Sequence, residues 1–195
     1  MLSLRIFLFL MFPGFLFAQN GLQRFDDQVL ISLSEHRTPA KTGFFLFLSK
    51  HNDVVNIGVP AGLLVGGIIS NDKQMRQNAL YVASSSAVNA LLTMLVKKVA
   101  KRPRPFLGQV KINAVYQPAH YSFPSGHTST SFTTATALSQ AYPKWYVIAP
   151  AYLYAGSVSF SRLYLGVHYP TDVAAGALLG TGTAFSMKFL KPKAN

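Results

Sequence analysis

The chain has 195 residues, of which half are apolar and only 12% are charged, whereas about 25% are charged in ordinary soluble domains. This length allows one domain, and the absence of cysteine excludes a disulfide framework and a thiolate metal site. The net charge is +12, but the basic residues stand at the ends of apolar runs and are not interleaved with stacking aromatics. We therefore predict no nucleic-acid partner and expect anionic lipid headgroups or a phosphorylated substrate to attract these cations.

Residues 1–18 have the pattern of an export signal. Met1–Arg5 carries one positive charge, Ile6–Phe17 is apolar, and Ala18 is a small residue at the end of that stretch. We predict a signal peptide or, without cleavage, an N-terminal anchor. In both cases the residues that follow begin on the outer side of a membrane.

Residues 19–52 are predicted to form an amphipathic segment at the membrane surface, because apolar residues recur at helical spacing opposite a polar face. The apolar residues are Leu22, Phe25, Val29, Leu30 and Leu33, and the polar ones are Arg24, Asp26, Asp27, Gln28 and Glu35. Contact with an ordinary protein core is the alternative interpretation. Phe44–Leu48 is too short to cross a membrane and is predicted to continue the surface segment.

Five longer apolar runs follow within residues 53–190, each of 14 to 18 residues and uncharged apart from Lys188. They are Val54–Ser70, Ala79–Val96, Thr128–Ala141, Trp145–Phe160 and Val173–Leu190. A membrane span needs roughly 20 residues, with 17 as the low end, so each run needs polar flanks to cross. We predict an all-α, helical-bundle integral membrane protein with about five to six transmembrane helices, followed by a basic tail at residues 191–195.

Two glycine pairs, Gly62–Gly66 and Gly176–Gly180, have the spacing that lets membrane helices approach closely. Chance occurrence in glycine-rich helices is the alternative. The predicted breaks between helices are Asn71–Gln77, Pro103–Pro124, Tyr142–Lys144 and Arg162–Thr171.

Alternation of the helices from an outer start places three polar clusters on the same, outer side. These are Lys97–Arg104, Pro124–His127 and Arg162–Asp172. Three clusters that reach one face can build one site. The positive-inside rule supports this orientation only weakly, because six basic residues would lie outside.

Each cluster has residues suited to a chemical task. Pro124–His127 opens a helix, where Gly126 lets a ligand approach the free N–H groups that favour an anion; a simple helix cap is the alternative. His168 and Asp172 are four residues apart, so the carboxylate can fix the tautomer of the imidazole; a structural pair is the alternative. Lys97 lies at the end of a helix and Arg104 in the turn after it, where both cations can bind an anion. The alternative is that both side chains only extend toward the membrane–water interface, which would give the same pattern.

Together the clusters resemble the three-part signature of the type 2 phosphatidic acid phosphatase and vanadium haloperoxidase superfamily. Lys-x6-Arg-Pro matches Lys97 and Arg104-Pro105; Pro-Ser-Gly-His matches Pro124–His127; Ser-Arg-x5-His-x3-Asp matches Ser161, Arg162, His168 and Asp172. The neighbouring Arg102-Pro103 does not fit the first part, because Leu95 occupies the lysine position. The resemblance covers roughly residues 53–190.

The resemblance implies a phosphatase that uses no metal and no cofactor. It implies that Lys97, Arg104 and Arg162 bind the phosphoryl oxygens, with hydrogen bonds from Ser125 and the Gly126 N–H. It further implies that His168 attacks phosphorus to form a phosphohistidine, that Asp172 holds the ring of His168, and that His127 protonates the leaving oxygen and then activates water. The remaining histidines are His36, His51 and His120, of which His120 is expected nearest the rim of the site.

We therefore expect an integral membrane phosphatase that acts on a lipid phosphate, of isoprenyl diphosphate, phosphatidyl phosphate or lipid A type. Membrane lipids and this substrate are the expected partners, and the expected location is the bacterial inner membrane with the site on the periplasmic side. The alternatives are a vanadate-dependent haloperoxidase, a soluble periplasmic acid phosphatase and a non-catalytic basic membrane protein. The identity of the lipid and the oligomeric state stay open at this stage.

Overall fold

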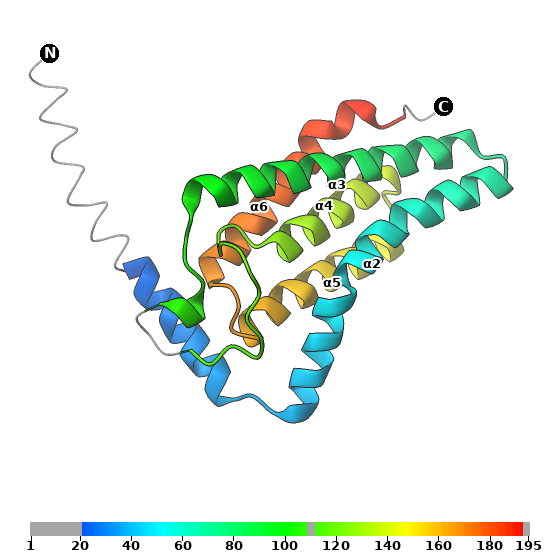
Figure 1. The fold of residues 1–195 in the computed structure, drawn as a ribbon. Coiled ribbons are helices and arrows are strands. Elements are labelled where there is room, and N and C mark those ends of the chain that lie inside the picture. Colours follow the sequence, from blue (N-terminus) through cyan, green and yellow to red (C-terminus); the bar gives the residue numbers. More distant parts are fainter. Residues whose placement is uncertain (1–20, 109–111, 193–195) are drawn as a thin grey trace, which may run out of the picture.

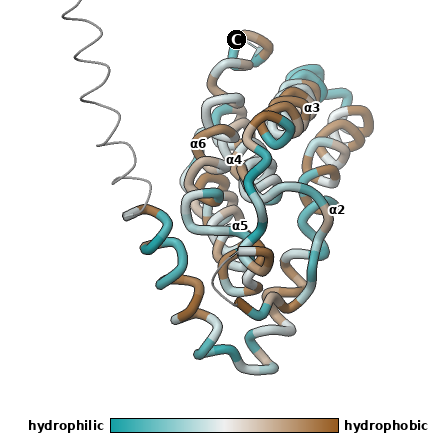
Figure 2. Tube along the Cα trace, turned by 60° about the vertical axis from the view of Figure 1, so that its left-hand side comes forward, coloured by the Kyte–Doolittle hydropathy of each residue, from teal (hydrophilic) through white to brown (hydrophobic). Residues whose placement is uncertain are grey.

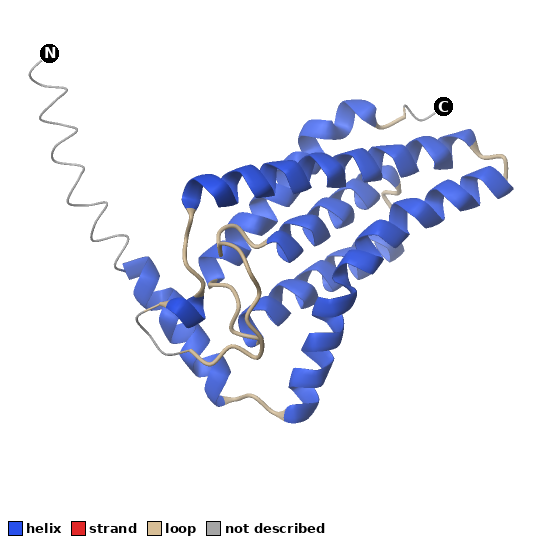
Figure 3. Cartoon of the chain, in the orientation of Figure 1, coloured by secondary structure: helices blue, strands red, loops and turns tan. Residues whose placement is uncertain are grey.

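The computed structural model describes residues 21–108 and 112–192, and these contain helices, turns and loops without a strand (Figures 1 and 3). A helix of residues 21–35 comes first. The named elements are α2 (Pro39–Ile69), α3 (Lys73–Ala100), the 3₁₀ turn η1 (Pro105–Leu107), α4 (Gly126–Ala141), α5 (Trp145–Tyr164), α6 (Pro170–Ser186) and the 3₁₀ turn η2 (Met187–Leu190). The all-helical prediction is confirmed. The predicted signal segment, residues 1–18, lies outside the described residues.

Helix α4 lies in the middle of the bundle, where it packs against α3, α5 and α6 (Figure 1). Its buried positions are mostly Ser, Thr and Ala. Hydroxyl groups on α4 pair with amides of neighbouring helices: Ser131 Oγ donates to Asn52 Oδ1 at 2.6 Å, and Ser129 Oγ donates to Asn89 Oδ1 at 2.6 Å. The interior of this bundle is therefore polar and hydrogen-bonded.

The outer surface of the bundle is apolar. Large exposed hydrophobic side chains include Val54, Ile57, Leu80, Leu91, Leu153 and Leu178. Hydrophobic residues run along the helices in Figure 2, while the helix of residues 21–35 alternates between hydrophilic and hydrophobic. Apolar side chains facing outward and paired polar side chains facing inward are typical of helices that contact lipid.

Three helical segments are long and apolar enough to cross a membrane: Pro39–Ile69, Lys73–Leu107 and Pro170–Leu190. Helix α4 has only 16 residues, about 24 Å at 1.5 Å per residue, against a hydrocarbon core of about 30 Å. All five predicted apolar runs are helical, whereas the prediction of five to six transmembrane helices stays a prediction.

The two glycine pairs have different outcomes. A Cβ atom at Gly176 would stand 2.6 Å from the Ser125 carbonyl oxygen, and one at Gly180 would stand 2.1 Å from that of Ser129. Only glycine permits this approach of α6 to α4, so the prediction for this pair is confirmed. A Cβ at Gly62 would meet nothing within 4 Å, whereas one at Gly66 would stand 3.2 Å from the Met75 sulfur of α3. In the first pair, therefore, only Gly66 lies at a close approach of two helices.

Helix α2 crosses residue 52, where the surface segment was expected to end and the spanning region to begin. Phe44–Leu48 and Val54–Ser70 belong to one helix of 31 residues, which bends partway along its length (Figure 1) and contains Pro60. The division at residue 52 had assigned the two runs to different segments, a surface segment and the first span. Instead, Ser49 and Asn52 are buried and face the interior of the bundle, where their polar groups have partners.

Two of the predicted breaks are shorter than expected. Helix α5 continues to Tyr164, so Arg162 lies in its last turn, and α6 begins at Pro170. Helix α3 begins at Lys73 because Asp72 caps it by accepting a hydrogen bond from Met75 N at 2.9 Å.

The helix of residues 21–35 is confirmed as a helix, but one of its faces packs against protein. Asp26 and Leu30 are both 0% exposed, whereas Leu22 and Phe25 are more than half exposed. Leu30 packs with Ile112. The alternative of a protein-core contact therefore applies to part of this helix.

The loop between α3 and α4 and the loop between α5 and α6 lie at the same end of the bundle, next to the helix of residues 21–35 (Figure 1). Hydrogen bonds described below join the two loops. The prediction that the three polar clusters meet at one face is confirmed.

Candidate active site

The start of α4 offers free backbone donors. Ser125 is the N-cap of the helix, and its side chain makes no capping hydrogen bond, so the N–H groups of the first turn keep no intrahelical acceptor. Ser125 is buried, its Oγ accepts from Thr128 Oγ1 at 3.0 Å, and its N–H donates to the Asp172 carbonyl oxygen at 3.0 Å. The second and third motifs are thus joined directly.

Asp172 is the third residue of α6 and lies beside His168, which precedes that helix. Its Oδ2 accepts from Tyr169 N at 2.9 Å and from Ser122 Oγ. His168 Nδ1 lies 3.5 Å from the same oxygen and has no closer hydrogen-bond partner among the described residues. The carboxylate is therefore held in place by other donors and faces Nδ1 at a distance long for a hydrogen bond.

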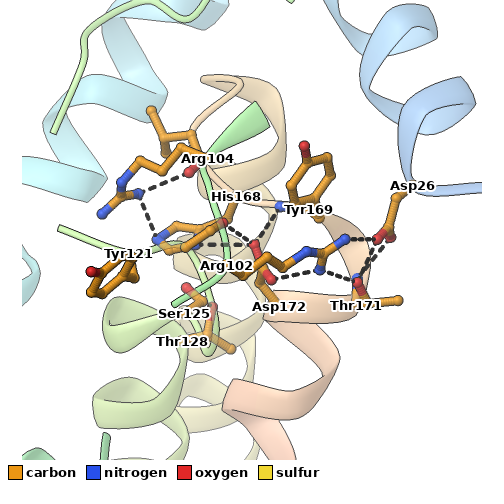
Figure 4. Close-up of polar contacts among 12 residues, drawn as sticks. Asp26, Arg102, Arg104, Tyr121, Ser125, Thr128, His168, Tyr169, Thr171 and Asp172 are labelled. Atoms are coloured by element: carbon orange, nitrogen blue, oxygen red, sulfur yellow. Dashed lines mark hydrogen bonds and ion pairs between the residues drawn. The ribbon is translucent and has the colours of Figure 1, made fainter. Parts of the chain in front are cut away.

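Arg104 lies on the other edge of the same imidazole ring. Its Nη1 is 3.2 Å from His168 Nε2 (Figure 4). The guanidinium donates further hydrogen bonds to the backbone carbonyls of Val167 (2.8 Å), His120 (3.0 Å) and Ala119 (3.1 Å). A guanidinium only donates, so Nε2 presents its lone pair and Nδ1 carries the hydrogen that faces Asp172. This tautomer has its nucleophilic nitrogen next to a cation.

Burial sets the protonation state of His168, whose exposed fraction is 2%. Desolvation, together with the nearby Arg162 and Arg104 cations, lowers the pKa of His168 to about 3, although the neighbouring Asp172 carboxylate acts in the opposite direction. The imidazole is consequently neutral at physiological pH, which is the form that acts as a nucleophile.

Lys97 lies in the last turn of α3 and points into the loop region. Its Nζ donates to the carbonyl oxygens of Tyr121 at 2.7 Å and Ser122 at 3.4 Å. Because Ser122 also donates to Asp172, the lysine holds the loop segment that contacts the Asp172 carboxylate. Lys97 therefore contacts the site, in contrast to a cation that only reaches toward the interface.

Arg162 and His127 meet at Ser49 of α2. Arg162 is 2% exposed, and its Nη1 donates to Ser49 Oγ and, at 2.6 Å, to the Tyr116 hydroxyl. His127 Nε2 lies 3.2 Å from the Ser49 carbonyl oxygen. A carbonyl only accepts, so His127 carries a hydrogen on Nε2. To donate a proton to a leaving oxygen, the ring must in addition carry hydrogen on Nδ1, as the imidazolium.

The structure brings all eight predicted site residues to this end of the bundle and adds residues that the sequence did not single out. These are Asp26, Ser49, Arg102, Tyr116 and Ser122. None of them occupies a specified position of the matched motifs, and Arg102, which lies within the first motif, had been set aside for lacking a lysine seven residues earlier. The chain has only six acidic residues and 18 basic ones. This scarcity of carboxylates is the one feature of the sequence that could have indicated a special role for Asp26.

Among residues 21–108 and 112–192, no three histidine, aspartate or glutamate side chains gather in a way that could hold a metal ion.

Known proteins resemble the chain in sequence and in fold. Residues 78–194 match the model of the PAP2 superfamily. An undecaprenyl-diphosphatase of Sulfolobus acidocaldarius is 33% identical over 166 residues, which cover 83% of this chain and 76% of that protein.

Two solved structures have a similar fold. A transmembrane PAP2-type phosphatidylglycerolphosphate phosphatase from Bacillus subtilis superimposes with a TM-score of 0.73 at 23% identity, covering 94% of this chain and 92% of that one. LpxE of Aquifex aeolicus has a TM-score of 0.69 at 28% identity, covering 84% and 94%.

The motif resemblance is thereby confirmed, since the family match spans more than half of the chain and the Sulfolobus relative covers most of it. The chain belongs to the PAP2 superfamily and is a membrane phosphatase.

Proposed function

We propose that the protein hydrolyses a lipid phosphate through a phosphohistidine on His168. The observation that carries this proposal is the orientation of one imidazole ring. Its Nδ1 faces Asp172 at 3.5 Å, and its Nε2 faces the Arg104 guanidinium at 3.2 Å. A nucleophile needs an unprotonated nitrogen and a cation beside it to neutralise the phosphoryl oxygens. When phosphorus approaches, the Nε2 lone pair exchanges its contact with Arg104 for the bond to phosphorus, and the guanidinium turns to the phosphoryl oxygens.

In the first step the phosphoryl group binds among the cations of Lys97, Arg104 and Arg162 and the free N–H groups at the start of α4. His168 Nε2 attacks phosphorus, a new N–P bond forms, and the bond from phosphorus to the leaving oxygen breaks. His127 enters this step as an imidazolium, donates one of its two ring protons to that oxygen and becomes neutral. Its contact with the Ser49 carbonyl supports hydrogen on Nε2, so Nδ1 carries the other proton of the imidazolium.

In the second step a water attacks the phosphohistidine. His127, now lacking the proton it gave away, takes one from the water as the new O–P bond forms and the N–P bond breaks. Inorganic phosphate leaves and His168 returns to its neutral form. The fixed cations do the work that Mg²⁺ does in other phosphoryl-transfer sites.

For the substrate we propose a polyprenyl diphosphate. The name of the Sulfolobus relative supports it, since that protein is 33% identical over 83% of this chain. The likeness to the Bacillus phosphatidylglycerolphosphate phosphatase, at 23% identity, supports the fold alone. Phosphatidyl phosphates and phosphorylated lipid A are the substrates with which the diphosphate is to be compared.

We further propose that the protein lies in the bacterial inner membrane with this site on the periplasmic side. The export-like pattern of residues 1–18 supports this orientation, as does the location of Lys73, Arg76 and Lys144 at the opposite end of the bundle.

The test is phosphate release by the purified protein in detergent. The substrates are a polyprenyl diphosphate, phosphatidylglycerol phosphate, phosphatidic acid and phosphorylated lipid A, with the His168→Ala protein as the blank. The proposal predicts fastest release from the diphosphate. No phosphate release from any of the four lipids would end the proposal. In that case, oxidation of bromide by the protein with vanadate and hydrogen peroxide would favour the haloperoxidase alternative.

A further inference from the structure

Arg102 joins two buried carboxylates that come from distant parts of the chain. Its Nη1 donates to Asp172 Oδ1 at 2.7 Å and to Thr171 Oγ1 at 2.7 Å. Its Nη2 donates to Asp26 Oδ2 at 2.8 Å (Figure 4) and to Gln23 Oε1 at 3.0 Å. Both nitrogens of the planar fork are therefore used, one toward the catalytic loop and one toward the helix of residues 21–35.

Asp26 also holds the start of α6 directly. Its Oδ1 accepts from Thr171 N at 3.0 Å, and its Oδ2 accepts from the hydroxyl of the same residue. Asp172 follows Thr171 in that first turn. A residue of the N-terminal helix therefore contacts the same turn as the proposed catalytic carboxylate.

Apolar contacts support the same junction. Leu30, Ile112 and Tyr169 form a buried cluster, and the Arg102 guanidinium lies 4.0 Å over the Tyr169 ring. Tyr169 is also the N-cap residue of α6. The helix of residues 21–35 thus contacts both the polar and the apolar side of the turn that positions His168 and Asp172.

We propose that Arg102 and Asp26 are positioning residues for the Asp172–His168 pair, an inference that rests on the proposed function. Asp172 directs Oδ2 at His168 Nδ1, and Arg102 holds the other oxygen. Two anchored oxygens fix the plane of the carboxylate, whereas a carboxylate held at one oxygen can rotate. Asp26 keeps the guanidinium in place from the opposite side. The N-terminal helix, which lies outside the family match to residues 78–194, is in this way part of the catalytic apparatus.

Arginine and lysine differ at such a position. A lysine keeps the positive charge between the two carboxylates. Its single ammonium group, however, lacks the two rigidly spaced nitrogens with which the guanidinium donates to both carboxylates at once. Arg102→Lys therefore separates orientation from charge. Asp26→Asn keeps the size of the side chain and removes the charge that anchors Nη2, so it tests the same unit with a milder change.

The experiment measures phosphohistidine formation by rapid quench and inhibition by inorganic phosphate. The proteins are the full-length wild type, Arg102→Lys, Asp26→Asn and the double variant. Glu35→Gln is the matched control, since it removes one negative charge from an exposed position of the same helix. We expect Arg102→Lys to slow phosphohistidine formation by about 10- to 100-fold, the usual effect of losing a group that orients a reactive side chain.

Asp26→Asn should slow the step by about tenfold or less, and the double variant should be no slower than Arg102→Lys, because the two residues act as one unit. Inhibition by inorganic phosphate should stay within about twofold of wild type in every variant. A purely structural role would weaken phosphate binding and the reaction together.

Three results would overturn the inference: rates in Arg102→Lys and Asp26→Asn equal to that of Glu35→Gln, losses that multiply in the double variant, or phosphate inhibition that weakens in parallel with the rate. If Arg102→Lys does not yield folded protein, the Asp26→Asn protein decides alone. A wild type that hydrolyses no lipid phosphate and forms no phosphohistidine contradicts the proposed function itself, which keeps the two failures distinct.

Discussion

The two histidines of the site are held in different ways. On the His168 side, Asp172 accepts hydrogen bonds from Arg102, Tyr169 and Ser122, and Arg104 faces the other ring nitrogen. On the His127 side, one contact with a backbone carbonyl holds the ring. The proposed nucleophile is therefore aligned by several contacts before a substrate arrives, whereas the proposed proton donor has few contacts to give up when a leaving group approaches.

The arginines differ in the same way. Arg104 has its Nε and both terminal nitrogens engaged by the loops around His168. Arg162 is equally buried, yet its Nε has no hydrogen-bond partner among the described residues. A buried, unused donor beside His127 is available to a phosphoryl oxygen. Under the proposed mechanism, the aligned side chains are therefore those beside the new covalent bond, and an unused donor remains on the side of the leaving group.

The largest effect is expected from the nucleophile. His168→Ala should abolish turnover and the covalent intermediate together, because the proposed mechanism assigns the attack on phosphorus to the Nε2 atom of this residue. Phosphate release from lipid and aryl phosphates measures turnover, and retained inhibitor binding controls for folding. Residual turnover above the blank on either substrate would remove His168 from this role.

The next largest effect is expected at the aligning carboxylate. Asp172→Asn should lower the turnover rate by about 10²- to 10⁴-fold, since the amide cannot support the imidazole in the required tautomer. Inhibition by inorganic phosphate should remain close to wild type, because Asp172 orients and does not bind the phosphoryl group. A loss of phosphate binding as large as the loss in rate would show that the residue supports the fold of the site.

The effect of removing His127, the histidine with few contacts, is expected to depend on the substrate. His127→Ala should slow hydrolysis of a lipid phosphate by about 10²- to 10⁴-fold. An aryl phosphate has a leaving group that needs little protonation, so formation of the intermediate from it should be damaged less. Rapid-quench measurements with both substrates make the comparison. Equal damage with both would mean that His127 is not the proton donor.

The smallest effect is expected from a chelator. Lys97, Arg104 and Arg162 supply fixed positive charge, so activity in EDTA should equal activity without it. The control is the same preparation with Mg²⁺ restored. Activity that disappears with EDTA and returns with Mg²⁺ would contradict the assignment of these three cations.

The sequence predicted those parts of the molecule that depend on local pattern. Apolar runs located the five long helices, and fixed spacing located His127, His168 and Asp172. Contacts across long separations were out of reach: Asp26 and Arg102 are 76 residues apart, and Ser49 and Tyr116 are 67 apart. Their pairing depends on the path of the loop between α3 and α4, which has no periodic pattern.

Helix α2 illustrates the same limit within one element. Its polar residues near Ser49 and Asn52 have the composition of a break between a surface segment and a span. They are helical because the interior of this bundle is polar and offers partners such as Ser131 and Tyr116. In a membrane bundle a polar stretch marks an inward face as readily as a helix end.

The most direct test of the central claim is identification of the phosphorylated atom. Wild-type protein is mixed with a phosphorus-labelled aryl phosphate, quenched in alkali within milliseconds and analysed by peptide mapping. The account predicts a single labelled residue, His168, with phosphorus on Nε2, the nitrogen that faces Arg104. Label on any other residue, or label on Nδ1 of His168, would contradict it.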